Sequence, residues 1–530
     1  MEVFTYDILV IGAGAAGLRS AIEAKGKGFE VAILSKTALG KGSCTSFSGA
    51  GFSAALGNVT RDEHFKNTLR IGRETNNKKL VKILVTEAPS RIFELKKFGV
   101  NIHIGDGIGT CKRKPPGLGL EISLPLLSHA EKIGIKSYDH RMVIDLMKEG
   151  QIVTGAIAYS LLSGEIEIFH SKATILATGG GGSLYGNSDN PIHITGDGYV
   201  LAVNAGAVLQ DMEFVQFYPM GLVATLIIPP SLADDGKILN KYGEDIPQKY
   251  GISDKPIAVR CRDKLSRAIF SEIQKGLGVN NHVLLDLTDL DDEAWNVNNL
   301  TQSWKKLLVM NFKSYDKPIP IRPVCHHFMG GISINEKCET SIPGLYAAGE
   351  VTGGIHGANR MGGNALSDTL VFGAIAGQNA VTFAVNSSFK KINREKINDY
   401  KKYTHFNNNS TDKGVSIKRL REKLGDILTE NAGIIRSDSG LKKGIIALKN
   451  IKAKDFPILT ASIPREVVKI LELLNGIEIG EMIMLSALHR KESRGSHFRE
   501  DFPSQNDNWR VSTIITKVKE TLVVSTKPLW

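Results

Sequence analysis

The stretch that decides the fold is Tyr6-Asp7-Ile8-Leu9-Val10-Ile11-Gly12-Ala13-Gly14-Ala15-Ala16-Gly17, near the start of a chain of 530 residues. Its apolar first half predicts a strand, and residues 18–25 continue as a helix. A second apolar run at 30–34 predicts the next strand, so the glycines lie between a strand and a helix of a βαβ unit. In that context the glycines let a pyrophosphate approach the backbone, and the helix N-terminus favours its charge.

This unit supplies the first predicted cofactor contacts. The phosphate contacts are assigned to Gly12, Gly14, Ala15, Ala16 and Gly17. In such a unit the second strand normally ends at an acidic residue that binds the adenine ribose. Here the strand leads into Ser35 and Lys36, to which the ribose contact is assigned without that acid.

Two later segments indicate whether the cofactor is NAD or FAD. The apolar run at 173–180 ends in Ala177-Thr178-Gly179-Gly180, and the run at 344–350 ends in Gly349-Glu350. Each turn alone is usually structural, and Glu350 alone could be a helix N-terminal charge. Together and in this order the turns resemble the later signatures of FAD-type flavoproteins. We therefore predict FAD, with contacts from Ala177, Thr178, Gly179 and Glu350.

Composition and charge narrow the class of protein. With 42% hydrophobic and 23% charged residues, the chain is long and apolar enough for about three or four folded units. The five cysteines form no CxxC pair, so we expect this chain to hold no iron–sulfur cluster, c-type haem or other metal. The net charge of +11 is spread thinly, which favours solvated lysines over a nucleic-acid site.

No signal peptide or transmembrane segment is expected from the sequence, because the apolar run 8–16 is too short to span a bilayer and follows acidic residues. The expected location is the cytoplasm, with contact to the inner face of the membrane only through a partner. The basic surface leaves an anionic membrane or a protein partner open.

The fold class predicted is α/β. A Rossmann-type FAD-binding domain (1–221 and 321–395) is interrupted by an α+β capping domain (222–320) and followed by a C-terminal helical domain (396–530). Residues 420–428 and 467–474 have helical periodicity, whereas the polar run 407–412 is typical of a linker.

Five longer motifs carry a resemblance over nearly the whole chain. They are Asp211-Met-Glu-Phe-Val-Gln-Phe217, Arg262-Asp263, His326-His-Phe-Met-Gly-Gly331, His356-Gly-Ala-Asn-Arg-Met-Gly-Gly-Asn364 and the segment 491–501. The chain resembles the flavoprotein subunit of the succinate dehydrogenase, fumarate reductase and L-aspartate oxidase family. The archaeal thiol-dependent (CoM/CoB) fumarate reductases are one group within that resemblance.

The resemblance implies a reaction and its residues. Family members transfer a hydride between flavin N5 and a carbon–carbon bond of a dicarboxylate. It implies that Arg262 donates or accepts the proton, that Arg360 and His326 clamp a substrate carboxylate, and that Tyr218 stands where a further carboxylate-binding His is usual. The remaining implied cofactor contacts are Ser43, Cys44, Thr45, Asp211, Asn364, Ala365 and Leu366.

Two departures from the family pattern modify this expectation. The usual flavin-tethering His is replaced by Cys44, so FAD is predicted to be non-covalent, with a thioether to Cys44 as the alternative. The usual relay Glu and Arg are replaced by Ile228-Pro229 and the run 232–236. The expected substrate is therefore a larger or less symmetric unsaturated acid than fumarate, unless Asp234 or Asp235 has taken over the relay.

Three functions follow. The favoured one is the flavoprotein subunit of an FAD-dependent reductase or dehydrogenase that acts on a CH–CH bond beside a carboxylate, with its electron partner in a separate iron–sulfur subunit. The second is a free-standing enzyme similar to L-aspartate oxidase. The third is a flavin electron-transfer subunit whose pocket acts on a different acid or has lost its chemistry.

Overall fold

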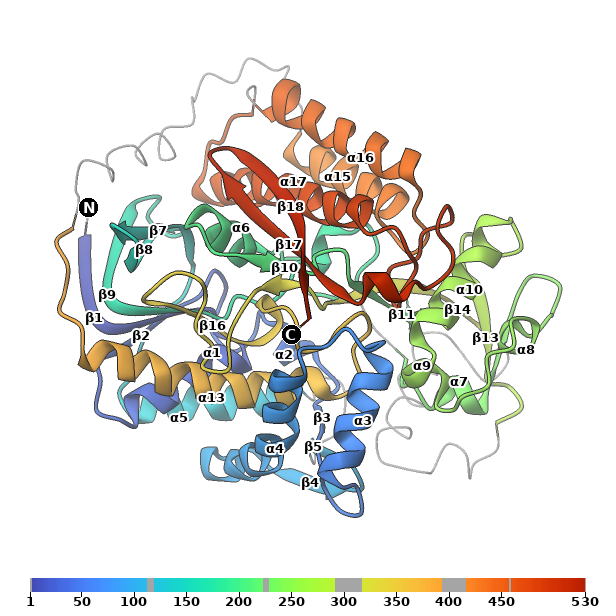
Figure 1. The fold of residues 1–530 in the computed structure, drawn as a ribbon, viewed down its shortest axis with the longest axis horizontal. Coiled ribbons are helices and arrows are strands. Elements are labelled where there is room, and N and C mark those ends of the chain that lie inside the picture. The colour runs from blue at the N-terminus through green and yellow to red at the C-terminus, as the bar shows by residue number, and fades with distance from the viewer. Residues whose placement is uncertain are drawn as a thin grey trace.

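The largest sheet of the computed structural model has seven strands and lies on the left in Figure 1. The structure describes residues 2–111, 119–222, 228–290, 317–392, 416–456 and 459–529. The order of the seven-stranded sheet is β6-β2-β1-β9-β8-β7, and β16 pairs with the C-terminal part of β9. Strands β6, β2, β1, β9 and β16 run parallel, as a Rossmann-type domain requires. The strands are β1 (Glu2–Ile11), β2 (Val31–Leu34), β6 (Lys136–Tyr138), β7 (Arg141–Glu149), β8 (Ile152–Ser160), β9 (Ile166–Leu176) and β16 (Leu345–Ala347).

The predicted βαβ unit is confirmed, with helix α1 (Ala15–Lys25) between β1 and β2. Gly12 has φ of 115°, and a Cβ there would lie 2.1 Å from the carbonyl oxygen of Ala177. A Cβ on Gly17 would lie 1.9 Å from the carbonyl oxygen of Gly12. These two glycines therefore allow the first helix to pack closely on its own turn and on the end of β9.

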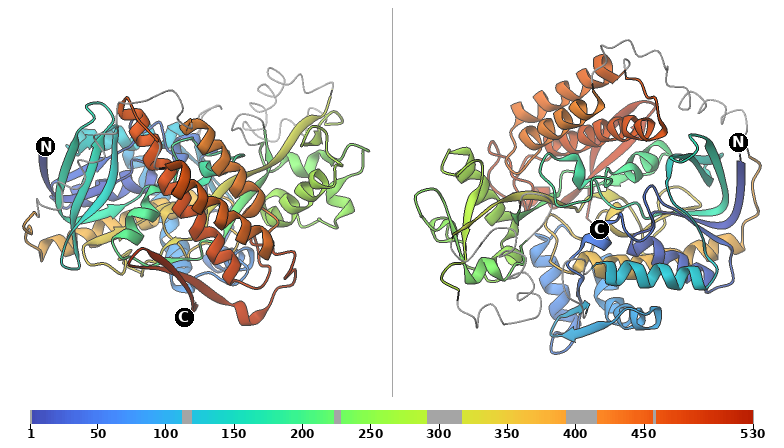
Figure 2. Two further views of the ribbon diagram at one scale, coloured as in Figure 1. Left: turned by 90° about the horizontal axis from the view of Figure 1, so that it is seen from above. Right: turned by 180° about the vertical axis from the view of Figure 1, so that it is seen from behind.

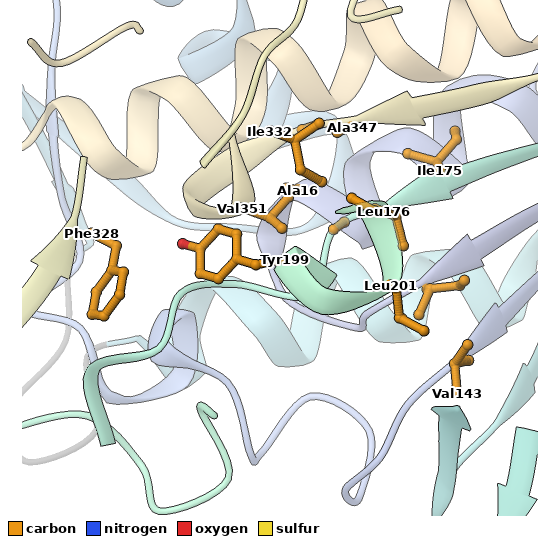
Figure 3. Close-up of a cluster of buried hydrophobic side chains, with 14 of the residues drawn as sticks. Ala16, Val143, Ile175, Leu176, Tyr199, Leu201, Phe328, Ile332, Ala347 and Val351 are labelled. Atoms are coloured by element: carbon orange, nitrogen blue, oxygen red, sulfur yellow. The ribbon is translucent and has the colours of Figure 1, made fainter. Parts of the chain in front are cut away.

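Helix α13 (Asn364–Val385) packs against α1, and α5 (Leu120–Lys132) lies on the same side of the sheet (Figure 1). Gly377 makes this contact close, since a Cβ there would meet the carbonyl oxygen of Ser20 at 2.4 Å. The main core continues beneath the turns that follow the parallel strands (Figure 3). There Tyr199, from α6 (Asp197–Asn204), stacks on Phe328 with ring centroids 5.9 Å apart.

A second sheet, with a core of its own, lies at one side of the molecule (Figures 1 and 2). The predicted capping segment (222–320) contains two of the four strands of this sheet in full, and the other two lie at or beyond the limits of that segment. The sheet order is β11-β14-β13-β12. The strands of this sheet are β11 (Val215–Gly221), β12 (Lys237–Leu239), β13 (Val283–Asp286) and β14 (Ile319–Phe328). The same part of the chain contains the helices α7 (Leu232–Asp235), α8 (Ile246–Lys249), α9 (Ile257–Arg260) and α10 (Arg262–Gln274).

The exact domain limits stay predictions. Residues 223–227 and 291–316, next to the predicted limits of the capping domain, lie outside the described residues, as do the boundary near 396 and the polar run 407–412. Strands β11 and β14 link the two cores, because each contributes residues to both.

The C-terminal part contains the predicted helices and one unexpected element. Residues 420–428 lie in α15 (Ile417–Asn431) and 467–474 lie in α17 (Pro464–His489), with α16 (Asp438–Asn450) between them. The chain then returns as a hairpin of β17 (Val511–Val518) and β18 (Thr521–Pro528). This hairpin pairs with β10 (Leu209–Gln210) and so joins the end of the chain to the flavin-binding part.

The remaining helices and strands include a small sheet of order β3-β5-β4 and a strand, β15, that pairs with β10. They are α2 (Cys44–Phe47), α3 (Arg61–Ile71), α4 (Lys78–Glu94), β3 (Gly51–Ser53), β4 (Ile102–Gly105), β5 (Ile108–Cys111) and β15 (Gly331–Ile332). Among the described helices, none combines the length and the apolar character needed to cross a bilayer.

Candidate active site

One continuous cavity of about 690 Å³ runs from the glycine turn after β1 to the capping segment. It brings together nineteen of the side chains and turns that the sequence singled out. Those lining it are Gly12, Gly14, Ala15, Ala16, Ser35, Lys36, Ser43, Cys44, Thr45, Ala177, Thr178, Gly179, Glu350, Ala365 and Leu366, together with Tyr218, Arg262, His326 and Arg360.

The N-terminus of α1 fits a pyrophosphate. Gly14 is its N-cap and provides no side-chain cap, so the N–H groups of the first turn point towards this end of the cavity. The Ala15 N–H donates to Thr45 Oγ1 at 3.0 Å, which orders the adjoining α2. Backbone donors and a helix dipole suit a phosphate without needing a basic side chain.

At the expected ribose end, Lys36 is already engaged. Its Nζ lies 2.7 Å from Thr195 Oγ1, 2.6 Å from Asp197 Oδ2 and 2.7 Å from Glu472 Oε1. These partners raise the pKa of Lys36 against the effect of its burial. Lys36 therefore joins the cavity wall to α6 and α17, and its alkyl stem is the part left for the cofactor.

Glu350 lies at the turn after β16, where β1, β9 and β16 end together. Its Oε1 accepts the Phe328 N–H at 3.0 Å, and a Cβ on Gly180 would lie 2.3 Å from that oxygen. Burial raises the pKa of Glu350 to about 7. The carboxyl is thus held in place by backbone, with a face on the cavity that could bind a cofactor hydroxyl.

The N-terminus of α13 forms the opposite wall. Gly363 is the N-cap with φ of 79° and no side-chain cap, and Ala365 and Leu366 line the cavity. Asn364 does not line it, because its side chain bonds to His64 Nε2 at 2.8 Å and Thr68 Oγ1 at 3.1 Å. Asn364 holds the helix end, while its neighbours face the cavity. An uncapped helix N-terminus there favours negative charge.

Cys44 lies in the cavity wall as a thiol. Its Sγ donates to Asn190 Oδ1 at 3.3 Å, and burial raises the pKa of the thiol well above its ordinary value. A thiolate is the reactive form of cysteine, so this environment disfavours nucleophilic attack by Cys44.

Arg262 begins α10 and extends from the capping segment into the cavity. Its Nε donates to the Ala258 carbonyl at 3.1 Å and its Nη1 to Gln216 Oε1 at 2.9 Å. The guanidinium lies over the Tyr218 ring at 5.1 Å. Burial lowers the pKa of Arg262. Its hydrogen-bond partners are an amide and a carbonyl, so neither can pass it a proton.

Arg360 and His326 meet beside Arg262. Arg360 Nη2 lies 2.9 Å from His326 Nε2, and Nη1 donates to the Met361 carbonyl at 3.2 Å. Its Nε has no partner among the described residues although it is buried. Burial and the neighbouring Arg262 lower the pKa of Arg360. Two buried guanidinium groups facing one cavity are suited to a substrate carboxylate.

The cavity wall beside the two arginines is mostly apolar. Ile228, Pro229, Pro230 and Val259 line it. Tyr218 contributes its ring, because its hydroxyl donates to the Ile228 carbonyl at 2.5 Å. The structure places no second cluster of cations on this wall within the described residues.

Two further predicted cofactor residues lie away from the cavity. Gly17 acts through helix packing, as described above. Asp211 is buried in a network with Thr513 and Arg490, where its Oδ1 accepts the Thr513 N–H at 3.0 Å. Asp211 therefore connects the C-terminal hairpin to the flavin-binding part. We do not propose it as a cofactor contact.

The suggested substitute relay residues also lie elsewhere. Asp234 Oδ1 accepts the Ile257 N–H at 2.9 Å and so caps α9, and neither Asp234 nor Asp235 lines the cavity. A relay from either carboxylate to Arg262 is not formed by the described contacts.

Comparison with known proteins decides the family. Residues 7–366 match a family described as an FAD binding domain, and residues 421–529 match the fumarate reductase flavoprotein C-terminal region. The chain belongs to the fumarate reductase and succinate dehydrogenase flavoprotein family. FAD is its cofactor, and it is an oxidoreductase acting on CH–CH groups.

Relatives of this flavoprotein extend over almost its full length. It is 39% identical to an uncharacterized FAD-dependent oxidoreductase of Methanocaldococcus jannaschii, and the alignment covers 96% of each chain. It is 34% identical to one subunit of the fumarate reductase (CoM/CoB) of Methanothermobacter marburgensis, over 98% of each chain. Its fold matches the Escherichia coli quinol fumarate reductase FrdA with a TM-score of 0.90 and 27% identity, over 100% of this chain and 97% of that one.

The flavoprotein's cavity also contains residues that the sequence did not single out. They are Asp189, Asn190, His193 and His327. The first three lie in the loop between β9 and α6, whose sequence contains no motif that we recognised. The fold places this loop beside β14. His327 belongs to one of the family motifs but lies next to the residue chosen, and its Nδ1 lies 3.4 Å from Glu350 Oε1.

Proposed function

We propose that this flavoprotein reduces the carbon–carbon double bond of an unsaturated acid that carries one carboxylate and an apolar remainder. The observation that carries the proposal is the make-up of the cavity lining among the described residues: the guanidinium groups of Arg262 and Arg360 lie beside the ring of Tyr218 and the apolar side chains of Ile228 and Pro229. Among the described residues, a second carboxylate beside these apolar side chains would lose its hydration without gaining a charged partner.

When bound and reduced by the electron donor, the flavin would supply a hydride to one alkene carbon and return to oxidised FAD, and a proton must reach the neighbouring carbon. Arg360 binds and orients the carboxylate through its guanidinium fork. Arg262 lies beside it and presents the proton at Nη2, which has no other hydrogen bond among the described residues. The apolar wall keeps water from the reacting carbons. Return of a proton to Arg262 is assigned to solvent after the product has left, since its described hydrogen-bond partners, Gln216 and Ala258, cannot supply one.

The test of the substrate class is anaerobic reoxidation of the chemically reduced holoprotein, followed by flavin absorbance. Crotonate and longer trans-2-enoic acids are expected to reoxidise it at least tenfold faster than fumarate at equal concentration. An Arg360→Lys variant should lose most of this rate, because an ammonium cannot replace the fork. Reoxidation by fumarate ahead of every monocarboxylate would overturn the substrate class and leave a fumarate reductase.

The cofactor is proposed to be bound without a covalent link. The support is the protonated, hydrogen-bonded state of Cys44 described above. Acid precipitation of the holoprotein should leave all flavin in the supernatant, for the wild type and for Cys44→Ser alike. Flavin that stays with the wild-type polypeptide and is released only in Cys44→Ser would show a thioether.

The electron donor is proposed to be a separate iron–sulfur subunit in the cytoplasm. All five cysteines are free, which suits a reducing compartment, and the described part of the chain contains no cluster of metal-binding side chains. The Methanothermobacter relative is named as one subunit of its enzyme, which supports a multi-subunit assembly. Co-purification of an iron-containing subunit from the native source tests this, and a single catalytically complete chain would favour the free-standing alternative.

A further inference from the structure

His326 lies between a carboxylate and a guanidinium, and this arrangement fixes its state. Its Nδ1 is 2.6 Å from Asp189 Oδ2, and its Nε2 is 2.9 Å from Arg360 Nη2. A guanidinium has only donors, so Nε2 must accept from Arg360. The single ring proton must then be on Nδ1 and be donated to Asp189. The contacts define one neutral tautomer of His326.

Asp189 is firmly positioned for this role. Its side chain is 6% exposed, and its Oδ1 accepts from Asn190 Nδ2 at 2.9 Å. The loop that carries it is joined to β14: the Asp189 N–H donates to the Cys325 carbonyl at 3.3 Å, and Asn190 Nδ2 donates to the His326 carbonyl at 3.0 Å. Each carboxylate oxygen of Asp189 thus has a fixed side-chain partner.

The charges in this region give Asp189 a second effect. Its negative charge attracts the guanidinium groups of both Arg262 and Arg360, which repel each other. A buried guanidinium without a nearby anion is costly. Asp189 therefore stabilises the arginine pair before substrate binds, while His326 keeps the carboxylate out of direct contact with Arg360.

We propose that Asp189 is a positioning residue for the substrate carboxylate. It holds His326 in the Nδ1–H tautomer, so that Nε2 accepts from Arg360 and fixes the direction of the guanidinium fork. Loss of the negative charge would allow the Nε2–H tautomer, whose proton would face an Arg360 N–H and displace the clamp. This inference rests on the proposed carboxylate site and adds the residue that orients it.

The test compares Asp189→Asn, Asp189→Glu and the control Asp7→Asn. Asp7 is an ion-paired Asp outside the cavity, bonded to Lys172, so its variant matches the change from carboxylate to amide. The first readout is the tautomer of His326, from ¹⁵N-histidine NMR of the holoprotein assigned with His326→Gln. The second is the affinity for butyrate and succinate, from perturbation of the oxidised flavin spectrum.

We expect wild type and Asp7→Asn to show the Nδ1–H tautomer, and Asp189→Asn to shift to Nε2–H with at least tenfold weaker acid binding. Flavin content should stay at the wild-type level, and Asp189→Glu should recover at least part of the affinity. An unchanged tautomer in Asp189→Asn, or equal loss of flavin and acid binding in both Asp189 variants, would overturn the proposal. If no acid binds even the wild type, the proposed function fails, and the NMR result still decides whether Asp189 sets the tautomer.

Discussion

Glu350 shows how burial controls a single residue of the cofactor site. Its folded-state pKa of about 7 lies above the ordinary value of 4.5. Between these values the unfolded chain is ionised and the folded one is protonated, so the unfolded state binds fewer protons and stability falls as pH rises. Below about pH 4.5 and above about pH 7, Glu350 no longer makes the free energy of unfolding change with pH.

Glu350→Gln should remove that slope in the flavin-free protein. The amide oxygen can still accept the Phe328 N–H, so the variant should gain up to about 3 kcal/mol relative to wild type between pH 5 and pH 8. Chemical denaturation at the two pH values measures the difference. An identical pH dependence in both proteins would show that Glu350 is ionised in the fold.

Membership of the candidate site could be predicted from the sequence only for residues that belong to a recognisable motif. Arg262, His326 and Arg360 lie together as expected because each belongs to an unusual string of neighbours. Asp189 could not be predicted, because its importance depends on a loop meeting β14, a contact between segments 137 residues apart in sequence. Asp211 illustrates the opposite case: it lies in a specific motif, yet the fold directs its side chain to the C-terminal hairpin.

At the scale of elements, the turn after β1 decides whether cofactor and sheet can meet. A Cβ on Gly12 would clash with the Ala177 carbonyl at 2.1 Å, and the backbone there has positive φ. Gly12→Ala should therefore abolish FAD binding and destabilise the domain by more than about 2 kcal/mol.

Gly28→Ala is the matched control for this turn. Gly28 also has positive φ, at 88°, but nothing lies within 4 Å of an added Cβ. It should cost only the backbone strain of about 1 kcal/mol and retain FAD. Flavin content and thermal unfolding compare the two variants, and similar losses in both would show that strain, not close approach, determines the effect.

The order of strands and helices could be predicted where periodicity and turn residues agree. The β1–α1–β2 unit and helices α15 and α17 follow patterns of local sequence. The C-terminal hairpin of β17 and β18 was not predicted, since its partner β10 has only two residues and lies far earlier in the chain, at Leu209–Gln210. Pairing over that distance leaves no local pattern to read.

At the scale of the whole molecule, the capping segment is held over the cavity by contacts with α3 and the loop after it. Arg73 Nη2 bonds Asp263 Oδ2 at 2.7 Å, and Asp263 follows Arg262 in α10. The Asp263 side chain is only 5% exposed. Arg73→Gln should remove this ion pair from a nearly buried carboxylate, destabilise the protein by about 1–3 kcal/mol and lower turnover by misplacing Arg262.

A second ion pair between the same two parts provides the control. Arg70 and Asp254 lie 3.2 Å apart, but their side chains are 51% and 46% exposed. Arg70→Gln should change stability by less than about 1 kcal/mol and leave turnover unaffected. Equal effects of the two variants on turnover would contradict a specific role for Arg73 in placing α10.

Arg262 and Arg360 together are proposed to serve reduction of a carbon–carbon double bond beside a carboxylate. The most direct test is a single anaerobic turnover in D₂O of reduced holoprotein with crotonate, with the product examined by NMR. We predict butyrate with one deuterium on each former alkene carbon, and a rate at least ~10³-fold lower in Arg262→Gln. No deuterated product from crotonate or any longer 2-enoic acid, or an Arg262→Gln variant as fast as wild type, would contradict this role for the two arginines.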